Sequence, residues 1–201
     1  MSETTTPVLR RVRMVLWGLV VVAAVGATLL FLFRPPSDPL GVTGQPFRLA
    51  STAGGEFTEA DLRGTPSLVF FGYTYCPDVC PTTLAESVAW KAQAGLSDEQ
   101  LRTIFITVDP ERDTEEVVRE YLAGFDPDVI GLVGTPEQTE AAKASFGAFS
   151  EKVGEEGDEF YLVNHTASVF LIGADGSFEG TIAYGEPMDT AVGKIRKLVE
   201  G

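Results

Sequence analysis

One uninterrupted apolar run dominates the N-terminal part of the chain. Residues 14–33 (MVLWGLVVVAAVGATLLFLF) comprise 20 residues and no charged side chain. As an α-helix the run would extend about 30 Å at ~1.5 Å per residue, which is sufficient to cross the hydrocarbon core of a bilayer. Since it has no polar face and is flanked by arginines, we expect a transmembrane anchor rather than a buried core helix.

The residues around this run predict its orientation. Three arginines precede it and one follows it, namely Arg10, Arg11, Arg13 and Arg34. The positive excess on the N-terminal side predicts that residues 1–13 form a cytoplasmic tail and that the rest of the chain crosses the membrane. Phe33-Arg34-Pro35-Pro36 lacks the small residues of a cleavage site, which argues against a cleaved signal peptide. We therefore expect a single-pass protein of a bacterial inner membrane with a periplasmic C-terminal domain.

A proline-rich segment follows the anchor and precedes a single domain. Residues 34–44 contain Pro35, Pro36 and Pro39, which favour a stiff, extended linker. Residues 45–201 show no internal repeat and no long low-complexity stretch. Their length suits one hydrophobic core.

Residues 45–201 alternate between strand-like and helix-like segments. Continuous apolar runs such as 67–73 (SLVFFGY) predict buried strands, and apolar positions at helical spacing predict the segments between them. The pattern predicts strands over 67–73, 102–108 and 129–133; helices over 77–95, 113–125, 136–146 and 188–199; and hairpins over 46–55 and 168–184. An early parallel crossover followed by a late antiparallel hairpin predicts an α/β thioredoxin-like fold, with a central mixed β-sheet flanked by helices and one insertion.

Charge separates the chain into two parts. The formal net charge is −14, yet residues 1–34 carry +3, so the remainder carries −17. A surface of this sign repels phosphate backbones, and we therefore expect no nucleic-acid partner. A basic protein partner fits the acidic domain better.

The chain has two cysteines, Cys76 and Cys80, at the predicted junction of strand 67–73 and the helix that follows it. A disulfide between them would close so short a loop that chain entropy contributes only about 2 kcal/mol, against about 4.7 kcal/mol for a 100-residue loop. Stabilisation of the fold by a disulfide is thus a weak explanation for the presence of the two cysteines. Residues i and i+4 of a helix share a face, so both sulfurs can meet one metal ion or each other. The helix N-terminus favours the thiolate that metal binding and thiol exchange both require.

The single histidine, His165, lies immediately before the predicted hairpin 168–184. In a thioredoxin-like fold this loop lies beside the cysteine motif, so the imidazole is expected near the two sulfurs. Two thiolates and one imidazole suit Cu(I), and also Cu(II), whereas a structural zinc site would require a fourth protein ligand.

Three segments carry a resemblance to a known family. The chain closely resembles the Sco/SenC family of copper-handling proteins in three segments that follow the N-terminal run. In order, they are FGYTYCPDVCPTTL (71–84), ITVDPERDT (106–114) and NHTASVFLIGADG (164–176). The resemblance covers the domain from about Phe47 to the C-terminus. It implies Cys76, Cys80 and His165 as copper ligands, and copper delivery to the Cu-A centre of cytochrome c oxidase.

The resemblance also implies partners. These are the copper-site subunit of the oxidase, other copper chaperones or thiol–disulfide proteins, and the membrane through residues 14–33. In this function the reduced cysteines bind Cu(I), His165 completes a three-coordinate site, and thiolates of a recipient displace these ligands one at a time. Such a protein is a carrier rather than an enzyme.

Two other functions use the same residues. Cys76 and Cys80 could form the redox pair of a membrane-tethered thiol–disulfide oxidoreductase, or the same site could serve a redox or copper sensor. His165 separates the first alternative from copper binding, because dithiol exchange does not require an imidazole.

Four further residues near the motifs have expected roles. Asn164 stands where the family usually has Asp, which predicts a different copper oxidation-state preference. Asp113 is expected to cap the helix over 113–125, and Asp109 to face the metal loop or a partner. Asp78 is expected at the mouth of the site or as a solvated acid of the first helical turn.

Overall fold

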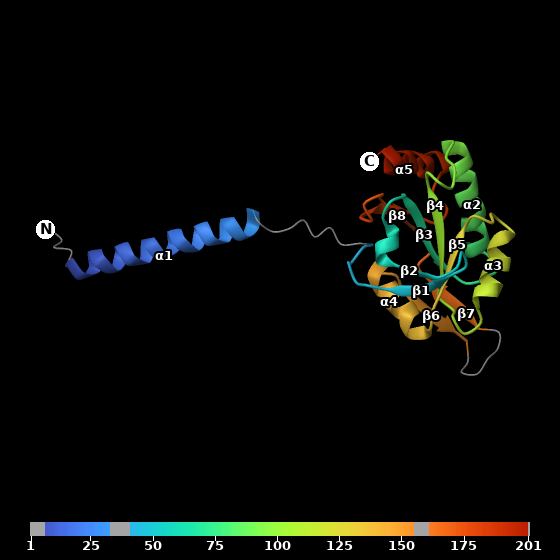
Figure 1. The fold of residues 1–201 in the computed structure, drawn as a ribbon, viewed down its shortest axis with the longest axis horizontal. Helices are drawn as coiled ribbons and strands as arrows, with labels where there is room; N and C mark the ends of the chain where they lie inside the picture. The colour runs from blue at the N-terminus through green and yellow to red at the C-terminus, as the bar shows by residue number, and fades with distance from the viewer. Residues whose placement is uncertain (1–6, 33–40, 155–160, 201) are drawn as a thin grey trace. The chain divides into compact units, whose positions relative to one another are not determined.

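The computed structural model describes residues 7–32, 41–154 and 161–200, which belong to two compact units, Met1–Ser37 and Asp38–Gly201 (Figure 1). The first unit contains helix α1 (Pro7–Leu32). Within it, Leu9–Leu29 is long and apolar enough to cross a membrane. The helix begins before the apolar run because arginine is a good helix former. Residues 1–6 of the expected tail, Phe33 at the end of the expected anchor and residues 34–40 of the expected linker lie outside the described residues.

A seven-stranded mixed sheet forms the centre of the second unit, in the order β2-β1-β5-β4-β3-β8-β9. Strands β3, β4 and β5 are parallel, whereas β8 runs antiparallel to β3, and β1 antiparallel to β5. All six residues of β3 are buried because strands pair with both of its edges and side chains cover both of its faces. The strands are β1 (Arg48–Ser51), β2 (Glu56–Thr58), β3 (Ser67–Gly72), β4 (Arg102–Thr107), β5 (Ile130–Val133), β8 (Val169–Ile172) and β9 (Phe178–Ile182).

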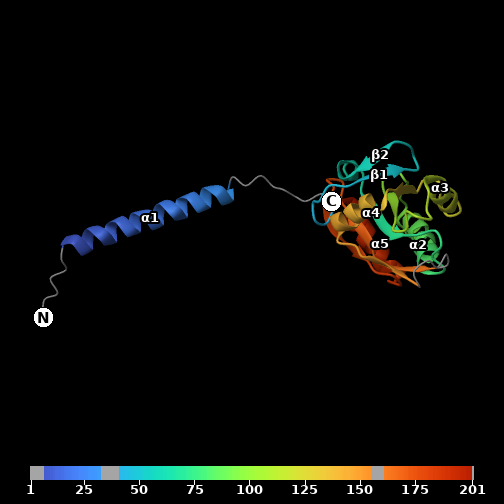
Figure 2. The same ribbon diagram turned by 90° about the horizontal axis from the view of Figure 1, so that it is seen from below.

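Helices pack around this sheet (Figure 2). They are α2 (Val79–Ala94), α3 (Glu115–Ala123), α4 (Pro136–Phe146) and α5 (Met188–Glu200), and a 3-10 turn, η1 (Glu59–Leu62), follows β2. Helix α2 packs against α5, α3 against β5, and α4 against β1. This arrangement confirms the predicted thioredoxin-like α/β fold.

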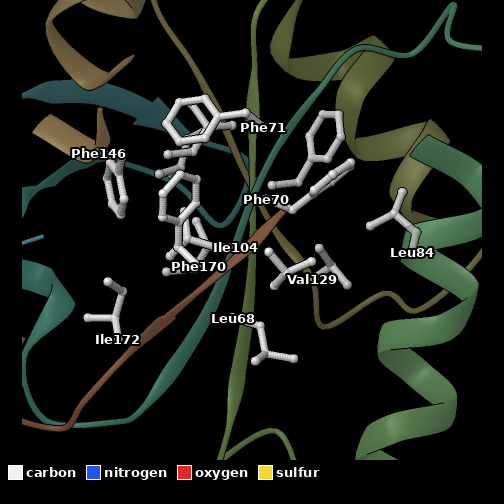
Figure 3. Packing of buried hydrophobic residues seen from close by; sticks show 14 of the residues in the cluster. Leu68, Phe70, Phe71, Leu84, Ile104, Val129, Phe146, Phe170 and Ile172 are labelled. Carbon is white, nitrogen blue, oxygen red and sulfur yellow. The ribbon is translucent and has the colours of Figure 1, made fainter. Parts of the chain in front are cut away.

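Aromatic side chains fill the core on both sides of β3 (Figure 3). The ring of Phe71 packs against Phe146 of α4 at 5.5 Å and against Phe170 of β8 at 6.0 Å between centroids. The Phe70 side chain points to the opposite face of the sheet and packs against the ring of Phe105 of β4, with 6.1 Å between the centroids. Burial of this cluster fixes β3, the strand that leads into the cysteines.

A second, two-stranded sheet consists of β6 (Ser150–Val153) and β7 (Leu162–His165), and the sequence pattern did not predict it. Its register pairs Ser150 with His165 and Val153 with Leu162. We call these two strands the histidine hairpin, because β7 ends on His165. In chain order it lies between α4 and β8.

Candidate metal centre

The end of β3 packs closely against the Cys80 sulfur. At Gly72, a Cβ atom would lie 2.9 Å from the Cys80 sulfur and 2.7 Å from the Phe105 ring. These distances are too short for any side chain other than hydrogen. The chain then leaves the sheet, passes Cys76 in the loop, and enters α2, whose first turn contains Cys80.

The structure brings the three predicted ligand residues together. The two sulfurs and a ring nitrogen of His165 all lie within 4.8 Å of one another. The Cys76 sulfur accepts a hydrogen bond from the Cys80 N–H at 3.3 Å, and the Cys80 sulfur lies 3.4 Å from His165 Nε2. Cys76 is 9% exposed, Cys80 is 0% exposed and His165 is partly exposed, so the cluster is reached from the side of Cys76 and His165.

A backbone carbonyl favours one tautomer of His165. Its Nδ1 lies 3.0 Å from the Thr166 carbonyl oxygen, which can only accept a hydrogen bond. A proton on Nδ1 satisfies this contact and leaves the Nε2 lone pair directed at the cysteines. That is the form of imidazole that binds a metal.

The two thiols differ in acidity. The pKa of Cys76 is lowered to about 4, chiefly by a hydrogen bond from Cys80 and further by backbone N–H groups, while burial opposes the shift. Burial raises the pKa of Cys80 far above its ordinary value, and its hydrogen bond with Cys76 raises it further. In the metal-free protein Cys76 is therefore the thiolate and Cys80 the thiol that stabilises it.

Aromatic rings enclose the imidazole. The rings of Phe70 and Tyr73 meet the His165 ring edge-on, with centroids 5.9 and 5.8 Å away. The Tyr73 hydroxyl accepts a hydrogen bond from the Val163 N–H at 3.2 Å. These groups remove water from one side of the cluster and hold β7 beside it.

The prediction that Asp113 caps the helix was wrong, because its side chain is buried. Thr114, and not Asp113, caps α3 by accepting a hydrogen bond from the Val117 N–H. Asp113 instead accepts bonds from Thr107 and from the N–H and hydroxyl of Thr74. Burial raises the pKa of Asp113, although the hydrogen bonds oppose that shift.

Asp109 is also buried, with contacts inside its own loop and to the segment before β7. Its carboxylate accepts hydrogen bonds from Arg112 and from the hydroxyl of Tyr161. Sequence reasoning missed Arg112 and Tyr161 as parts of the site, since their roles depend on tertiary contacts. The motif ITVDPERDT was the only sequence signal at this position, and it covers Arg112 but not Tyr161.

Two other expected residues lie at the surface. Asp78 is exposed at the N-cap position of α2, where its side chain makes no capping hydrogen bond. Asn164 is exposed on β7 and, by strand alternation, points to the face opposite His165. We therefore do not expect Asn164 to orient the imidazole directly.

A second cluster of acidic residues consists of Asp98, Asp126 and Asp128. The buried ammonium of Lys91 contacts Asp98 and lies 3.5 Å from a carboxylate oxygen of Asp126. Lys91 thus already supplies the positive charge that these carboxylates require. The cluster is an ion-pair network rather than a metal centre.

Comparisons with known proteins show which family this chain resembles in sequence and in structure. Residues 36–200 match the family model described as SCO1/SenC. A SCO2-like protein of Rickettsia felis is 35% identical over 166 residues, which cover 77% of this chain and 81% of that protein. For two other relatives the aligned part is shorter, and the chain spans about half of their length, 53% and 48%.

Solved structures show the same fold. The structure of Bradyrhizobium japonicum ScoI with copper bound has a TM-score of 0.67 and 37% identity, and covers 76% of this chain and 97% of its own. The crystal structure of yeast Sco1 with copper bound has a TM-score of 0.69 and 33% identity, and covers 78% and 87% of the two chains. The cysteine–histidine cluster, the family match and these structures together show that the chain belongs to the SCO1/SenC family.

Proposed function

We propose that this protein is a membrane-anchored copper chaperone that binds copper through Cys76, Cys80 and His165 and delivers it to the Cu-A centre of cytochrome c oxidase. The observation that carries the proposal is the convergence of two sulfurs and one imidazole nitrogen within 4.8 Å. Copper-bound structures of two relatives support it.

The donor set matches the cargo. Soft sulfur ligands with one imidazole favour Cu(I), which accepts three ligands, whereas a structural zinc ion takes four. Metal binding would draw the proton from the Cys80 thiol, since a coordinating thiol is deprotonated. The fully buried Cys80 would hold the ion from the core side, and Cys76 and the partly exposed His165 would complete its coordination.

Release follows from the same geometry. Because Cys76 and His165 are both more exposed than Cys80, recipient thiolates would replace these two ligands before the fully buried Cys80 sulfur. Copper thus passes by ligand exchange without free ions. The acidic domain would attract a basic recipient, and the transfer rate would fall as salt rises.

The apolar helix α1 supports a membrane anchor. The arginines before it support a cytoplasmic N-terminus and a periplasmic copper domain in a bacterial inner membrane. The proposed partners are the copper-site subunit of the oxidase and other copper chaperones or thiol–disulfide proteins.

A Cu(I) competition titration of the reduced full-length chain in detergent tests the proposal. We expect one tightly bound equivalent in the wild type, weaker binding in His165→Ala, and none in the Cys76→Ser/Cys80→Ser variant. Asn164→Ala is the matched control, because it changes the neighbouring exposed residue. Binding by the wild type no tighter than by the double serine variant would overturn the proposal.

The unequal acidity of the two cysteines supports a second candidate function, thiol–disulfide exchange. Cys76 would attack a target disulfide as the thiolate, and Cys80 would resolve the mixed disulfide. The two thiols would be oxidised to a disulfide as the target is reduced to two thiols. Exchange with a test disulfide that persists in His165→Ala, in a chain that binds no copper, would favour this function over the first.

A further inference from the structure

The histidine hairpin is joined to the rest of its unit in an unusual way. It is not part of the seven-stranded sheet. In the described residues, and besides the contact between the Cys80 sulfur and His165 Nε2, the hydrogen bonds that connect β7 and Tyr161 to the main body run through the side chains of Tyr73, Asp109 and Arg112. The position of His165 therefore depends on side chains more than on a backbone ladder.

Most of these bonds come from the loop between β4 and α3. Asp109, which is fully buried, accepts a hydrogen bond from the Tyr161 hydroxyl at 2.6 Å and binds the Arg112 guanidinium. Arg112 in turn donates to the Tyr161 carbonyl at 3.0 Å. Both ends of Tyr161, the hydroxyl and the main chain, are thus fixed by the same loop.

Stacking adds to these hydrogen bonds. The guanidinium carbon of Arg112 lies 3.6 Å from the ring centroid of Tyr161 and 4.8 Å from that of Tyr75. Tyr161 immediately precedes β7, and Tyr75 immediately precedes Cys76. One cation therefore bridges the segment that carries the histidine and the segment that carries the first cysteine.

The loop holds the cysteine segment as well. Asp113 binds the N–H and the hydroxyl of Thr74, two residues before Cys76. The two carboxylates of one loop thus bind the two halves of the metal centre separately, Asp113 the cysteine half and Asp109 the histidine half.

We propose that Asp109, Arg112 and Tyr161 form a latch that positions His165 against the cysteines. These are positioning residues, since none of them is a ligand. The latch rests on the copper role of His165 proposed above. Without the latch, β7 would keep its pairing with β6, but the distance between His165 and Cys80 would no longer be fixed. Copper would then be left with the two sulfurs.

The single histidine of the chain allows a direct test. The imidazole C–H signals of the metal-free, reduced, full-length chain in detergent can be recorded by NMR without ambiguity of assignment. Tyr161→Phe removes the hydroxyl and keeps the ring, and Asp109→Asn removes the buried charge. We expect both to shift or broaden the His165 signals.

Lys152→Gln is the matched control. The Lys152 ammonium lies 4.8 Å from the centroid of the same Tyr161 ring, but it is exposed and pairs with Glu111. We expect this substitution to leave the imidazole signals and the Cu(I) affinity as they are in the wild type. An equal shift in all variants would show a general perturbation of the hairpin and overturn the latch.

Copper titration supplies the second readout. We expect the latch variants to lower Cu(I) affinity by roughly 10-fold, the lower end of the effect of groups that orient metal ligands. In a His165→Ala background the same substitutions should change affinity by less than about twofold, because the latch acts through the histidine. An equal loss in both backgrounds, or unchanged imidazole signals in Tyr161→Phe and Asp109→Asn, would overturn the proposal.

The two proposals fail in distinguishable ways. If the wild type binds no copper above the double serine variant, the copper function fails, while the NMR signals still report whether the latch positions His165. If the wild type binds copper and the latch variants match it in signals and affinity, only the latch fails.

Discussion

The two halves of the metal centre are held by different physical means. The cysteine half follows β3, a fully buried strand with parallel and antiparallel neighbours, and Cys80 lies in α2 directly above Gly72. The histidine half lies on a separate two-stranded sheet that side chains connect to the main body. The core strands therefore determine the positions of the sulfurs, whereas polar side-chain contacts and the rings of Phe70 and Tyr73 determine the position of the imidazole.

This difference suits a carrier. A metal that must be bound and then released requires some ligands that stay in place and others that can move. Strand and core contacts open with nearly the free energy of global unfolding, whereas segments with few buried contacts open at much lower cost. Loss of core packing should thus affect the whole domain, and loss of a hairpin contact should affect mainly His165.

The largest effect is expected for Gly72→Ala. The added Cβ would overlap the Cys80 sulfur and the Phe105 ring, so we expect the free energy of unfolding to fall by about 3 kcal/mol. Chemical denaturation of the full-length chain in detergent measures this loss. The matched control is Gly193→Ala in α5, where nothing lies within 4 Å of the added atom and a gain of about 0.5–1 kcal/mol is expected. Similar stability of the two variants would contradict the tight approach at Gly72.

The next effect is a weaker pH dependence of Cys76 alkylation than an ordinary thiol would show. A pKa lowered to about 4 means that the thiolate is populated above that pH and lost below it, so the iodoacetamide rate should be nearly constant between pH 6 and 8. An ordinary thiol with a pKa near ~8.5 would react about tenfold faster for each unit in that window. Cys80→Ala removes the main hydrogen bond to Cys76 and should restore that rise. Mass spectrometry of the reduced, metal-free chain would locate the label, and a steep rise in the wild type would contradict the assignment.

A smaller and local effect is expected for Tyr73→Phe. The substitution leaves the Val163 N–H without its acceptor, which costs about 1 kcal/mol. Hydrogen exchange should accelerate at the Val163 amide and leave the β3 amides nearly unchanged. Tyr121→Phe is the matched control, because the buried Tyr121 hydroxyl has no hydrogen-bond partner among the described residues. Equal acceleration in β3 would show that the two halves of the site are not independent.

The contrast between the halves also explains what the sequence could predict. The strands β3 and β8 are nearly uninterrupted apolar runs and β4 has an apolar centre, while the proposed ligands are the only cysteines and the only histidine of the chain. The histidine hairpin escaped prediction because SEKV and LVNH combine exposed, charged and apolar residues without a clear period. Asp109 and Asp113 look like exposed turn acids in the sequence, and only the packing of Thr74, Tyr161 and Arg112 around them reveals that they are buried.

The smallest effect is expected for Asn164→Asp, which introduces the acidic residue that the resemblance led us to expect beside His165. Asn164 faces away from His165 and lies directly opposite Glu151 in the hairpin register. A carboxylate there would meet a like charge across the strands, and we expect a loss of about 0.5 kcal/mol of stability. Because the position is exposed and screened, Cu(I) affinity should change by less than about twofold. A tenfold change in affinity, with a shift of the His165 imidazole signals, would show that the exposed face of the histidine hairpin also controls the imidazole. The position of His165 would then be even less fixed than the side-chain contacts indicate.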